Sequence, residues 1–353
     1  MGAAPRVSVI IAAFNAASTV REACDSVLSQ TYPDVELIVV DDGSTDATPK
    51  ILAEYGDRVR VVSQRNGGLA SARNAGVRAA RGELIALMDA DDRCHPERVA
   101  VQAGALALLP EARLCGSEFS AFDAAGTVSP SHGSRYYSVI GETPGGLASL
   151  FRHCATLTPE LGGGAGAPAH VLHGSVYPDI AFGNFVHPPT VMFRRAAFDA
   201  AGPFDESLRY SSDWEWFVRV ARLGPFQHLT RPLLEYRLSP SQMSGKSVNE
   251  GKSAVDIVRA AEKIWRADPA LAKQHRARIR RCRREFHFDA AYAIADKHPA
   301  LAARMLATSV WHGARVLPAL KTAIRIAMPA RLQRVARASR GRAASNPDRP
   351  TRP

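Results

Sequence analysis

Residues 35–46 read VELIVVDDGSTD, a short β-branched apolar run that ends in acidic and small residues. A run of this kind is typical of a strand that is covered on both faces of a sheet. The same pattern occurs in residues 7–14 (VSVIIAAF) and in residues 83–92 (ELIALMDADD). Because helical periodicity separates these runs, the sequence predicts an α/β layered sheet with right-handed crossovers.

The predicted strands and helices alternate through the first hundred residues. Thr19 and Glu22 match a capping box at the start of the first helix. The regularity weakens from Leu114 to Val191, and a helix capped by Ser212 follows. We expect strands at 7–14, 35–40, 58–63 and 83–88, with helices starting near 18, 47, 69 and 96.

Acidic clusters follow two of the predicted strands. Asp41 and Asp42 end one strand, and Asp89, Asp91 and Asp92 end another. Open α/β sheets bind ligands beyond the carboxyl ends of their strands. Three carboxylates within four residues repel one another unless a cation or solvent offsets their charge. Because Mg²⁺ and Mn²⁺ prefer oxygen ligands, the second cluster is a candidate metal site.

The same acidic residues also have a structural interpretation. Asp92 could cap the helix that begins near Pro96, and Thr45 or Asp46 could cap the helix after the first cluster. We assign Asp46 this structural role. Two acidic strand ends at one sheet edge favour a ligand site for the other carboxylates.

The formal net charge of +11 is distributed unevenly along the chain. Residues 251–353 hold 23 Lys and Arg against 7 Asp and Glu, whereas residues 1–250 hold 22 against 27. The larger N-terminal part is therefore mildly acidic. Without a zinc-finger or RNP-like motif, the charge alone does not support a nucleic-acid-binding function.

Five cysteines occur without a CxxC pair or metal-ligand spacing, which argues against a zinc site or a disulfide framework. This usage fits a reducing cytosol. No signal peptide is recognisable, and no run of about 18 apolar residues predicts a spanning helix. We expect a cytoplasmic protein, with peripheral membrane association left open.

Four segments, in order and at plausible spacing, resemble the family-2 inverting glycosyltransferases. A lone DxD motif would be weak, whereas the series is specific. The segments are residues 7–48 (VSVIIAAFNAASTVREACDSVLSQTYPDVELIVVDDGSTDAT), 66–92 (NGGLASARNAGVRAARGELIALMDADD), 182–224 (FGNFVHPPTVMFRRAAFDAAGPFDESLRYSSDWEWFVRVARLG) and 236–244 (YRLSPSQMS).

The resemblance implies a GT-A fold, an α/β fold whose mixed central sheet is flanked by helices. One domain at 1–250 would join a nucleotide-sugar-binding half (1–113) to an acceptor-binding half (114–250). A helical, Arg-rich extension at 251–344 and a disordered tail at 345–353 would follow.

The resemblance also implies which residues bind the donor. Phe14, in place of the more frequent Tyr, and Asn15 would lie beside the base. The resemblance assigns Asp42, with Asp41 nearby, to the base and ribose, and it places Arg73 and Asn74 near the nucleotide. It assigns Asp91 to the metal and diphosphate, Asp89 to the ribose side and Asp92 to a supporting role. Arg237 would close over the diphosphate. The implied cofactor is Mg²⁺ or Mn²⁺, held by Asp91, Asp89 and Asp92.

Asp213 matches the family's catalytic-base position, where the preceding residue is usually Glu and here is Ser212. The base would take the proton of the acceptor hydroxyl during one inverting displacement. We expect the helix start to keep this carboxylate ionised. His187 and Trp214 would lie on the acceptor side, although a structural loop histidine and a core tryptophan are the alternatives.

The C-terminal third contains a cationic amphipathic pattern. Leu317, Leu320 and Ile324 recur at helical spacing with Met328 and Leu332 beside basic residues. Such a helix can lie on an anionic membrane surface. It can also pack its apolar stripe on the catalytic domain, with the arginines in solvent.

The sequence thus predicts a metal-dependent inverting glycosyltransferase that uses a nucleotide-diphospho-sugar donor and a glycan or lipid-linked acceptor. Cell-envelope polysaccharide or glycolipid biosynthesis is the expected context. A pyrophosphorylase-like nucleotidyltransferase and a non-catalytic nucleotide- or nucleic-acid-binding protein are the alternatives. The first should carry a glycine-rich loop after its first strand, where residues 12–19 read AAFNAAST. The donor stays open among UDP-glucose, UDP-galactose, an N-acetylhexosamine donor and GDP-mannose.

Overall fold

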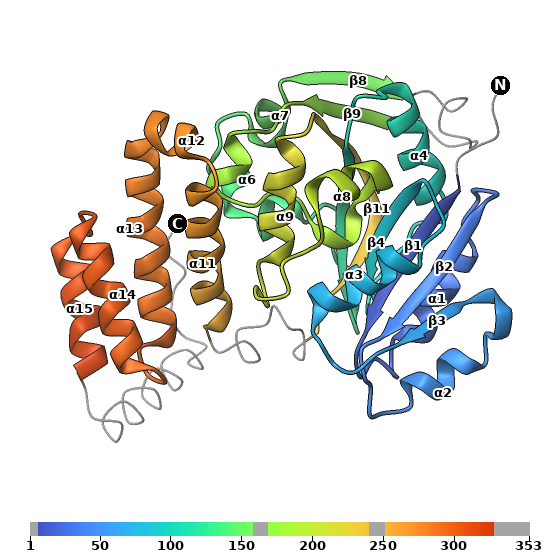
Figure 1. Cartoon of the computed structure of the whole chain (residues 1–353), viewed down its shortest axis with the longest axis horizontal. Coiled ribbons are helices and arrows are strands. Elements are labelled where there is room, and N and C mark those ends of the chain that lie inside the picture. Colours follow the sequence, from blue (N-terminus) through green and yellow to red (C-terminus); the bar gives the residue numbers. More distant parts are fainter. Residues whose placement is uncertain (1–5, 158–168, 240–250, 328–353) are drawn as a thin grey trace. The chain divides into compact units, whose positions relative to one another are not determined.

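The computed structural model describes residues 6–157, 169–239 and 251–327. The chain divides into two compact units, residues 1–242 and residues 243–353. The first unit is built on a large sheet and the second on helices (Figure 1). Residues 162–168 and the predicted tail at 345–353 lie outside the described residues.

The strands described in the N-terminal unit form one mixed sheet. Its order is β3-β2-β1-β4-β10-β6-β11-β9-β8, while β5 pairs with β11 and β7 with β6. Strands β3, β2, β1 and β4 run parallel, and β10 is antiparallel to both β4 and β6. The strands are β1 Val7–Ala13, β2 Val35–Asp41, β3 Arg60–Ser63, β4 Leu84–Asp89, β5 Arg93–Cys94, β6 Leu114–Asp123, β7 Gly126–Ser129, β8 His153–Leu157, β9 Ala169–Gly174, β10 Met192–Arg194 and β11 Phe226–Arg237.

Helices flank this sheet on both faces (Figure 1). Those of the N-terminal unit are α1 Val20–Leu28, α2 Thr48–Ala53, α3 Leu69–Ala79, α4 Arg98–Leu108, α5 Gly133–Tyr136, α6 Ser138–Glu142, α7 Gly146–Phe151, α8 Arg195–Ala201 and α9 Ser212–Ala221, with short 3-10 turns η1 Gly56–Arg58, η2 Asp179–Phe182 and η3 Pro188–Thr190.

The core explains why the first strands read as continuous apolar runs. Val9 and Ile11 of β1 join a cluster with α1 and α4, whereas Ile38 and Val40 of β2 pack with α3. A Cβ on Gly76 of α3 would lie 2.3 Å from Ile10 Cγ2, so a glycine is needed where this helix meets the sheet. Both faces of the strands are therefore buried, as predicted.

Register places both acidic clusters at one edge of the sheet. Ala13 of β1 pairs with Asp41 of β2, and Ala12 pairs with Asp89 of β4. Because the three strands are parallel, their carboxyl ends meet there. The predicted edge is confirmed.

Some local predictions are wrong. The Thr19 side chain makes no cap to α1, and Glu22 instead pairs with the distant Arg93 and Arg237. Helix α9 starts at Ser212 itself, after Ser211 without a side-chain cap. Asp92 does not cap the helix after Pro96, which begins only at Arg98.

The stretch from 114 to 191 is more regular than its sequence indicates. Its first ten residues form β6, a strand between β10 and β11. The pattern is obscured because small and polar residues are buried in it, including Cys115, Gly116 and Ser117. Long-range pairing, rather than local periodicity, specifies this strand.

The C-terminal unit is helical in its described part. Helix α13 packs against α11 and α14, and α14 packs against α15, around a core that contains Ile294, Met305 and Leu306. No helix among the described residues combines the length and the apolar character that crossing a membrane requires. The helices are α11 Lys252–Arg266, α12 Pro269–Gln274, α13 Arg276–Ile294, α14 Pro299–Trp311 and α15 Val316–Ala327.

Candidate active site

An ion pair between Arg73 and Asp89 lies at the carboxyl edge of the sheet. Arg73, on α3, is 2% exposed, and its Nη2 lies 2.9 Å from Oδ1 of Asp89 at the end of β4. The other terminal nitrogen, Nη1, is buried and has no hydrogen-bond partner among the described residues. A buried cation with an unused donor suits an anionic ligand, because an unpaired buried donor is costly.

Asp213 lies within electrostatic reach of this pair. Burial raises its pKa, the charge of Arg73 opposes this shift, and the charge of Asp89 adds to it. Trp214 N donates a 2.7 Å hydrogen bond to Asp213 Oδ1 at the start of α9. Burial is thus the largest influence on the pKa of this carboxyl, and the expectation that the helix start keeps it ionised stays a prediction.

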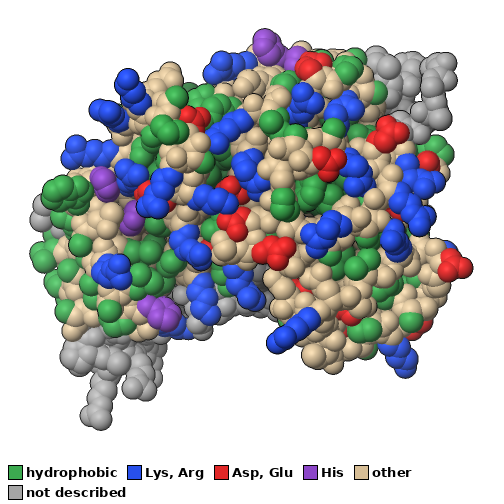
Figure 2. All heavy atoms as spheres, in the orientation of Figure 1, with side chains coloured by type: hydrophobic (Ala, Val, Ile, Leu, Met, Phe, Trp, Pro, Cys, Tyr) green, Lys and Arg blue, Asp and Glu red, His purple; other side chains and the backbone are tan. Residues whose placement is uncertain are grey.

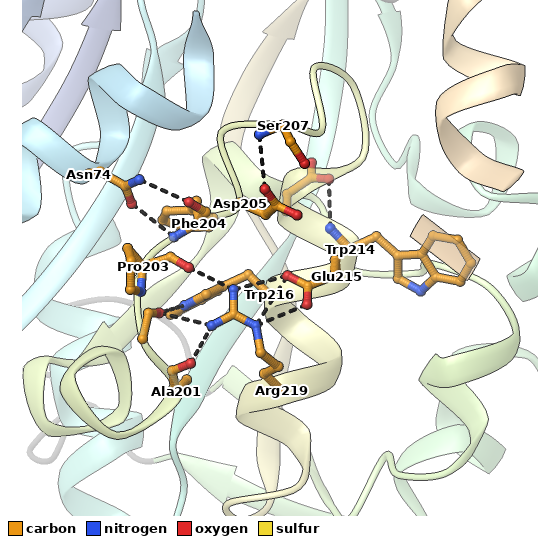
Figure 3. Close-up of polar contacts among 12 residues, drawn as sticks. Asn74, Ala201, Pro203, Phe204, Asp205, Ser207, Trp214, Glu215, Trp216 and Arg219 are labelled. Atoms are coloured by element: carbon orange, nitrogen blue, oxygen red, sulfur yellow. Dashed lines mark hydrogen bonds and ion pairs between the residues drawn. The ribbon is translucent and has the colours of Figure 1, made fainter. Parts of the chain in front are cut away.

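The loop before α9 is held by buried side chains (Figure 3). The Asn74 side chain accepts from Phe204 N at 2.8 Å and donates to Phe204 O at 2.9 Å. The Arg219 guanidinium pairs with Glu215 at 2.9 Å and donates to carbonyls of the loop, including Pro203 O. Asn74, predicted near the nucleotide, thus fixes the segment that leads to Asp213.

Trp214 lies in the core rather than on an open surface. It is 3% exposed, and its Nε1 donates to Ile180 O at 2.7 Å. Trp216 is completely buried against Phe193 and Phe204. This burial supports the core interpretation of Trp214, and both tryptophans anchor α9. The predicted contact of Trp214 with an acceptor stays a prediction.

The loop after β4 is tied to the end of β11. Arg237 N donates to Asp92 Oδ1 at 3.0 Å, and Arg237 Nε donates to Asp91 O at 2.8 Å. The Arg237 guanidinium also pairs with Glu22 and lies 4.5 Å from the centre of the Phe122 ring. Its predicted contact with a diphosphate stays a prediction.

The three carboxylates after β4 do not form a complete metal cage. Among the described residues, no group of three or more His, Cys, Asp and Glu side chains is placed to hold a metal ion. Burial raises the pKa of Asp92 well above its ordinary value, and the charges of Asp91 and Asp89 add to the shift. Asp92 Oδ2 is buried without a hydrogen-bond partner in the described part of the chain. Arg73 pairs with Asp89, and Arg98 opposes the shift at Asp92, but burial and the neighbouring carboxylates outweigh it.

Asp42 and Asp41 are used by the backbone around them. Asp42 accepts from Gln64 Nε2 at 2.7 Å, Gly67 N at 2.9 Å and Gly68 N at 2.8 Å. Asp41 Oδ1 accepts from Ser44 N at 3.0 Å. Both carboxylates stabilise loops beside the site, and their predicted contacts with base and ribose stay predictions.

Phe14 and Asn15 follow β1 at the same edge. The Phe14 ring is 52% exposed. Asn15 adopts a left-handed conformation with φ 50°, and its Oδ1 accepts from Thr45 N at 2.8 Å. Asp46 accepts from Ala17 N and Thr48 N and so stabilises the turn before α2, whose N-cap is Ala47 and not Thr45 or Asp46 as predicted. Asn15 thus shapes the loop that presents the exposed ring of Phe14.

His187 is the centre of an aromatic cluster that sequence reasoning missed. Its ring stacks on Phe119 at 4.1 Å, and Tyr137 Oη lies 3.1 Å from His187 Nδ1. Burial lowers the pKa of His187 to about 3, so the imidazole is neutral. The available signal was the Tyr136-Tyr137 pair within the stretch that appeared irregular. We call these rings the His187 cluster: Phe119, His132, Tyr136, Tyr137, His187 and Tyr236.

The fold is that of the GT-A glycosyltransferases. The structure is similar to residues 1–349 of Staphylococcus aureus TarS in complex with UDP-GlcNAc, with a TM-score of 0.53, 16% identity and coverage of 87% of this chain and 89% of that one. It is also similar to the mannosyltransferase PcManGT of Pyrobaculum calidifontis in complex with GDP-Man and Mn²⁺, with a TM-score of 0.52, 19% identity and coverage of 97% and 88%. These identities establish the shared fold alone.

Residues 8–156 match the family model described as Glycosyl transferase family 2, so this part of the chain is similar to that family. An uncharacterized glycosyltransferase of Rickettsia prowazekii is 27% identical over 256 residues, which are 72% of this chain and 70% of that protein. The succinoglycan biosynthesis protein ExoO of Rhizobium meliloti is 47% identical over 97 residues, which are 27% and 28% of the two chains. The predicted enzyme class is confirmed.

Proposed function

We propose that the chain transfers a sugar from a nucleotide-diphospho-sugar to an acceptor hydroxyl with inversion. The observation that carries this proposal is the buried Arg73, which holds Asp89 while Nη1 lacks a partner among the described residues and Asp213 lies in the same field. The buried cation is thus Arg73, its carboxylate partner is Asp89, and both influence the candidate base Asp213. In the proposed division, residues 1–113 bind the donor and residues 114–250 the acceptor.

Each group has a distinct task in the proposed reaction. Arg73 donates to the donor's anionic part and fixes the Asp89 carboxylate. Asp213 accepts the acceptor proton as the hydroxyl oxygen attacks the anomeric carbon, from the face opposite the leaving nucleoside diphosphate. A raised pKa makes the ionised Asp213 carboxylate a stronger base than that of an ordinary aspartate. One displacement inverts the anomeric configuration.

The residues after β4 fit a divalent cation that is shared with substrate. Mg²⁺ is usually bound by one or two carboxylates together with phosphate oxygens, so a three-residue protein cage is not required. Asp91 and Asp89 would hold the ion, and Asp92, bonded to the β11 backbone, would support the loop. The bound ion supplies charge stabilisation of the leaving diphosphate. Burial is the largest cause of the raised pKa of Asp92, and a nearby cation would offset the part that the charges of Asp91 and Asp89 add.

A donor panel tests the proposed function. Thermal unfolding of the full chain would be followed with UDP-glucose, UDP-galactose, UDP-GlcNAc and GDP-mannose, each with Mn²⁺ and with EDTA. We expect one donor to raise Tm in the presence of Mn²⁺, and NMR of the transfer product to show an inverted anomeric centre. Stabilisation by no donor, or retention of configuration, would contradict the proposal.

ExoO is named for succinoglycan biosynthesis, and this relative supports cell-envelope polysaccharide or glycolipid synthesis as the context. Such acceptors are often assembled at membranes, and the C-terminal unit has a suitable surface. On α14 and α15, Trp311 is 82% exposed and Leu317 is 64% exposed, while Val310, Leu320 and Ile324 are at least half exposed. Over α13–α15, apolar and basic side chains predominate on the face drawn in Figure 2.

Helix α15 buries its less hydrophobic face and exposes its more hydrophobic face. Ala319 and Thr322 are buried, whereas Leu317, Leu320 and Ile324 face solvent. Exposed Arg304, Arg315 and Lys321 accompany them. An apolar stripe with tryptophan and flanking cations suits the interface of an anionic bilayer, with roughly 1 kcal/mol per basic residue near the surface. We propose peripheral membrane attachment through this α14–α15 face.

Vesicle co-sedimentation tests this attachment. The full chain should pellet with phosphatidylglycerol vesicles and not with phosphatidylcholine vesicles. Leu317→Asp/Leu320→Asp should abolish pelleting, whereas Val128→Asp/Leu223→Asp, at exposed apolar positions of the N-terminal unit, should not. Equal pelleting of both double variants would reject the attachment through α15.

A further inference from the structure

Tyr136 is the exposed member of the His187 cluster. It ends α5, and 37% of it is exposed, whereas Phe119, His187 and Tyr236 are buried. The His187 ring meets Tyr136 edge-on at 5.0 Å, and the Tyr137 ring lies 4.8 Å from it. An aromatic side chain held by several rings loses little conformational entropy on binding a ligand, so it is a pre-organised contact surface.

The support beneath Tyr136 is itself fixed by polar contacts. Tyr137 Oη lies 3.2 Å from Val186 O and 3.1 Å from His187 Nδ1. His187 stacks on Phe119 of β6 and meets Tyr236 of β11 edge-on at 5.0 Å. Two neighbouring strands therefore anchor the cluster. Its placement does not depend on the short helix α5 alone.

The cluster adjoins the proposed catalytic groups. Burial raises the pKa of Tyr137 well above its ordinary value, and the charges of Asp213 and Asp89 contribute to the shift. Arg73 likewise contributes to the lowered pKa of His187. Tyr236 of the cluster also directly precedes Arg237, which is hydrogen-bonded to Asp92 Oδ1 and Asp91 O. The cluster therefore lies beside the proposed catalytic groups.

We propose that Tyr136 is the platform of an acceptor subsite that takes a pyranose ring, which makes the acceptor of this enzyme a glycan. This inference rests on the proposed glycosyl transfer. A pyranose presents axial C–H groups on one face, which pack against an aromatic ring, and hydroxyls around its rim. His187 Nε2 is buried without a hydrogen-bond partner among the described residues, and a rim hydroxyl would supply one.

The neutral state of His187 determines what the subsite recognises. A neutral imidazole donates or accepts one hydrogen bond at Nε2 and attracts no anion, so a hydroxyl fits it better than a phosphate or carboxylate. The surrounding rings exclude water, as in sites with few polar groups among aromatic ones. A neutral sugar residue satisfies both conditions, because its C–H face packs on an aromatic ring while a rim hydroxyl pairs with Nε2.

Binding measured without turnover tests the subsite. Methyl β-glycosides of glucose, galactose and N-acetylglucosamine would be titrated by saturation-transfer NMR against the full chain with UDP and Mn²⁺. We expect Tyr136→Ala to weaken binding of the preferred glycoside about tenfold, and Tyr136→Phe to retain it within about twofold. Tyr292→Ala, at a comparably exposed tyrosine of the C-terminal unit, should leave binding unchanged.

Two results would overturn the inference: absence of binding by any glycoside to the unchanged protein, or equal binding by the protein and Tyr136→Ala. Donor-induced thermal stabilisation of each variant keeps this test separate from the proposed function. If donors stabilise all variants and Tyr136→Ala binds glycosides normally, only the platform fails. If glycosides bind through Tyr136 but no donor is bound, the platform stands and the transferase proposal fails.

Discussion

The two acidic strand ends of the N-terminal unit lie at the same sheet edge but have different surroundings. At the end of β2, Asp42 accepts three hydrogen bonds from Gln64, Gly67 and Gly68. At the end of β4, Asp89 faces Arg73, whose Nη1 has no partner in the described ranges, and Asp213 has a raised pKa. The hydrogen bonds of the Asp42 carboxylate are thus made within the fold. Arg73 Nη1 and Asp213, in contrast, are arranged for a ligand from outside the chain.

The contrast distinguishes a carboxylate that builds the site from one that reacts in it. A buried acid surrounded by backbone N–H donors stabilises a loop, and its removal should be felt in unfolding. A buried acid with a raised pKa does not stabilise the folded protein when it is ionised. Its presence therefore points to a role in function. Substitution of the two acids should therefore separate stability from activity.

Asp213→Asn should have the largest effect on activity. The amide keeps the shape but cannot accept the acceptor proton, so we expect transfer to fall about 10³-fold or more. Donor-induced stabilisation in the thermal assay should persist, because the donor contacts lie elsewhere. Since burial raises the folded-state pKa of Asp213, its ionised form opposes folding, and Tm at neutral pH should not fall. Near-normal transfer by this variant would exclude Asp213 as the base.

The pH profile of transfer sharpens the same assignment. The base acts when it is deprotonated, and burial raises the pKa of Asp213. We therefore expect kcat/KM to fall about tenfold per pH unit as pH drops below a value higher than that of an ordinary aspartate. The profile would be measured between pH 4 and 8, in a range where thermal unfolding shows that the chain is folded. A rate that stays flat down to about pH 4 would contradict a raised pKa of the essential base.

Asp42→Asn should show the opposite pattern. The amide cannot accept all three hydrogen bonds, two of which come from the backbone before α3. We expect a loss of about 2 kcal/mol in the free energy of unfolding, measured by urea titration, with kcat reduced only a few fold. Asp57→Asn, on the exposed turn η1, is the matched control and should change neither. If Asp42→Asn unfolds normally but loses donor binding, Asp42 contacts the nucleotide directly.

The sequence predicts the acidic sheet edge because strand runs and their acidic ends are local patterns. It does not predict which carboxylates are satisfied, because the partners of Asp42 lie more than twenty residues away on Gly67 and Gly68. Strand β6 was missed for a similar reason, as its buried small residues are specified by β10 and β11. The His187 cluster likewise combines rings from distant segments. In each case the structure depends on contacts between distant segments, which a local sequence pattern does not contain.

Glu22→Gln should have the smallest effect and tests how Arg237 is held beside the acidic end of β4. Glu22 was expected to cap α1, but it holds Arg237, whose backbone N–H binds Asp92 beside the proposed donor site. The Glu22 side chain is 44% exposed, so the ion pair contributes little to stability, about 0–1 kcal/mol. If Arg237 binds the diphosphate, its release from Glu22 should lower the donor KM about twofold while Tm stays constant. Glu54→Gln, which breaks the comparably exposed pair with Arg21, is the control. An unchanged or higher donor KM in Glu22→Gln would mean that Arg237 supports the Asp91–Asp92 loop and does not bind the diphosphate.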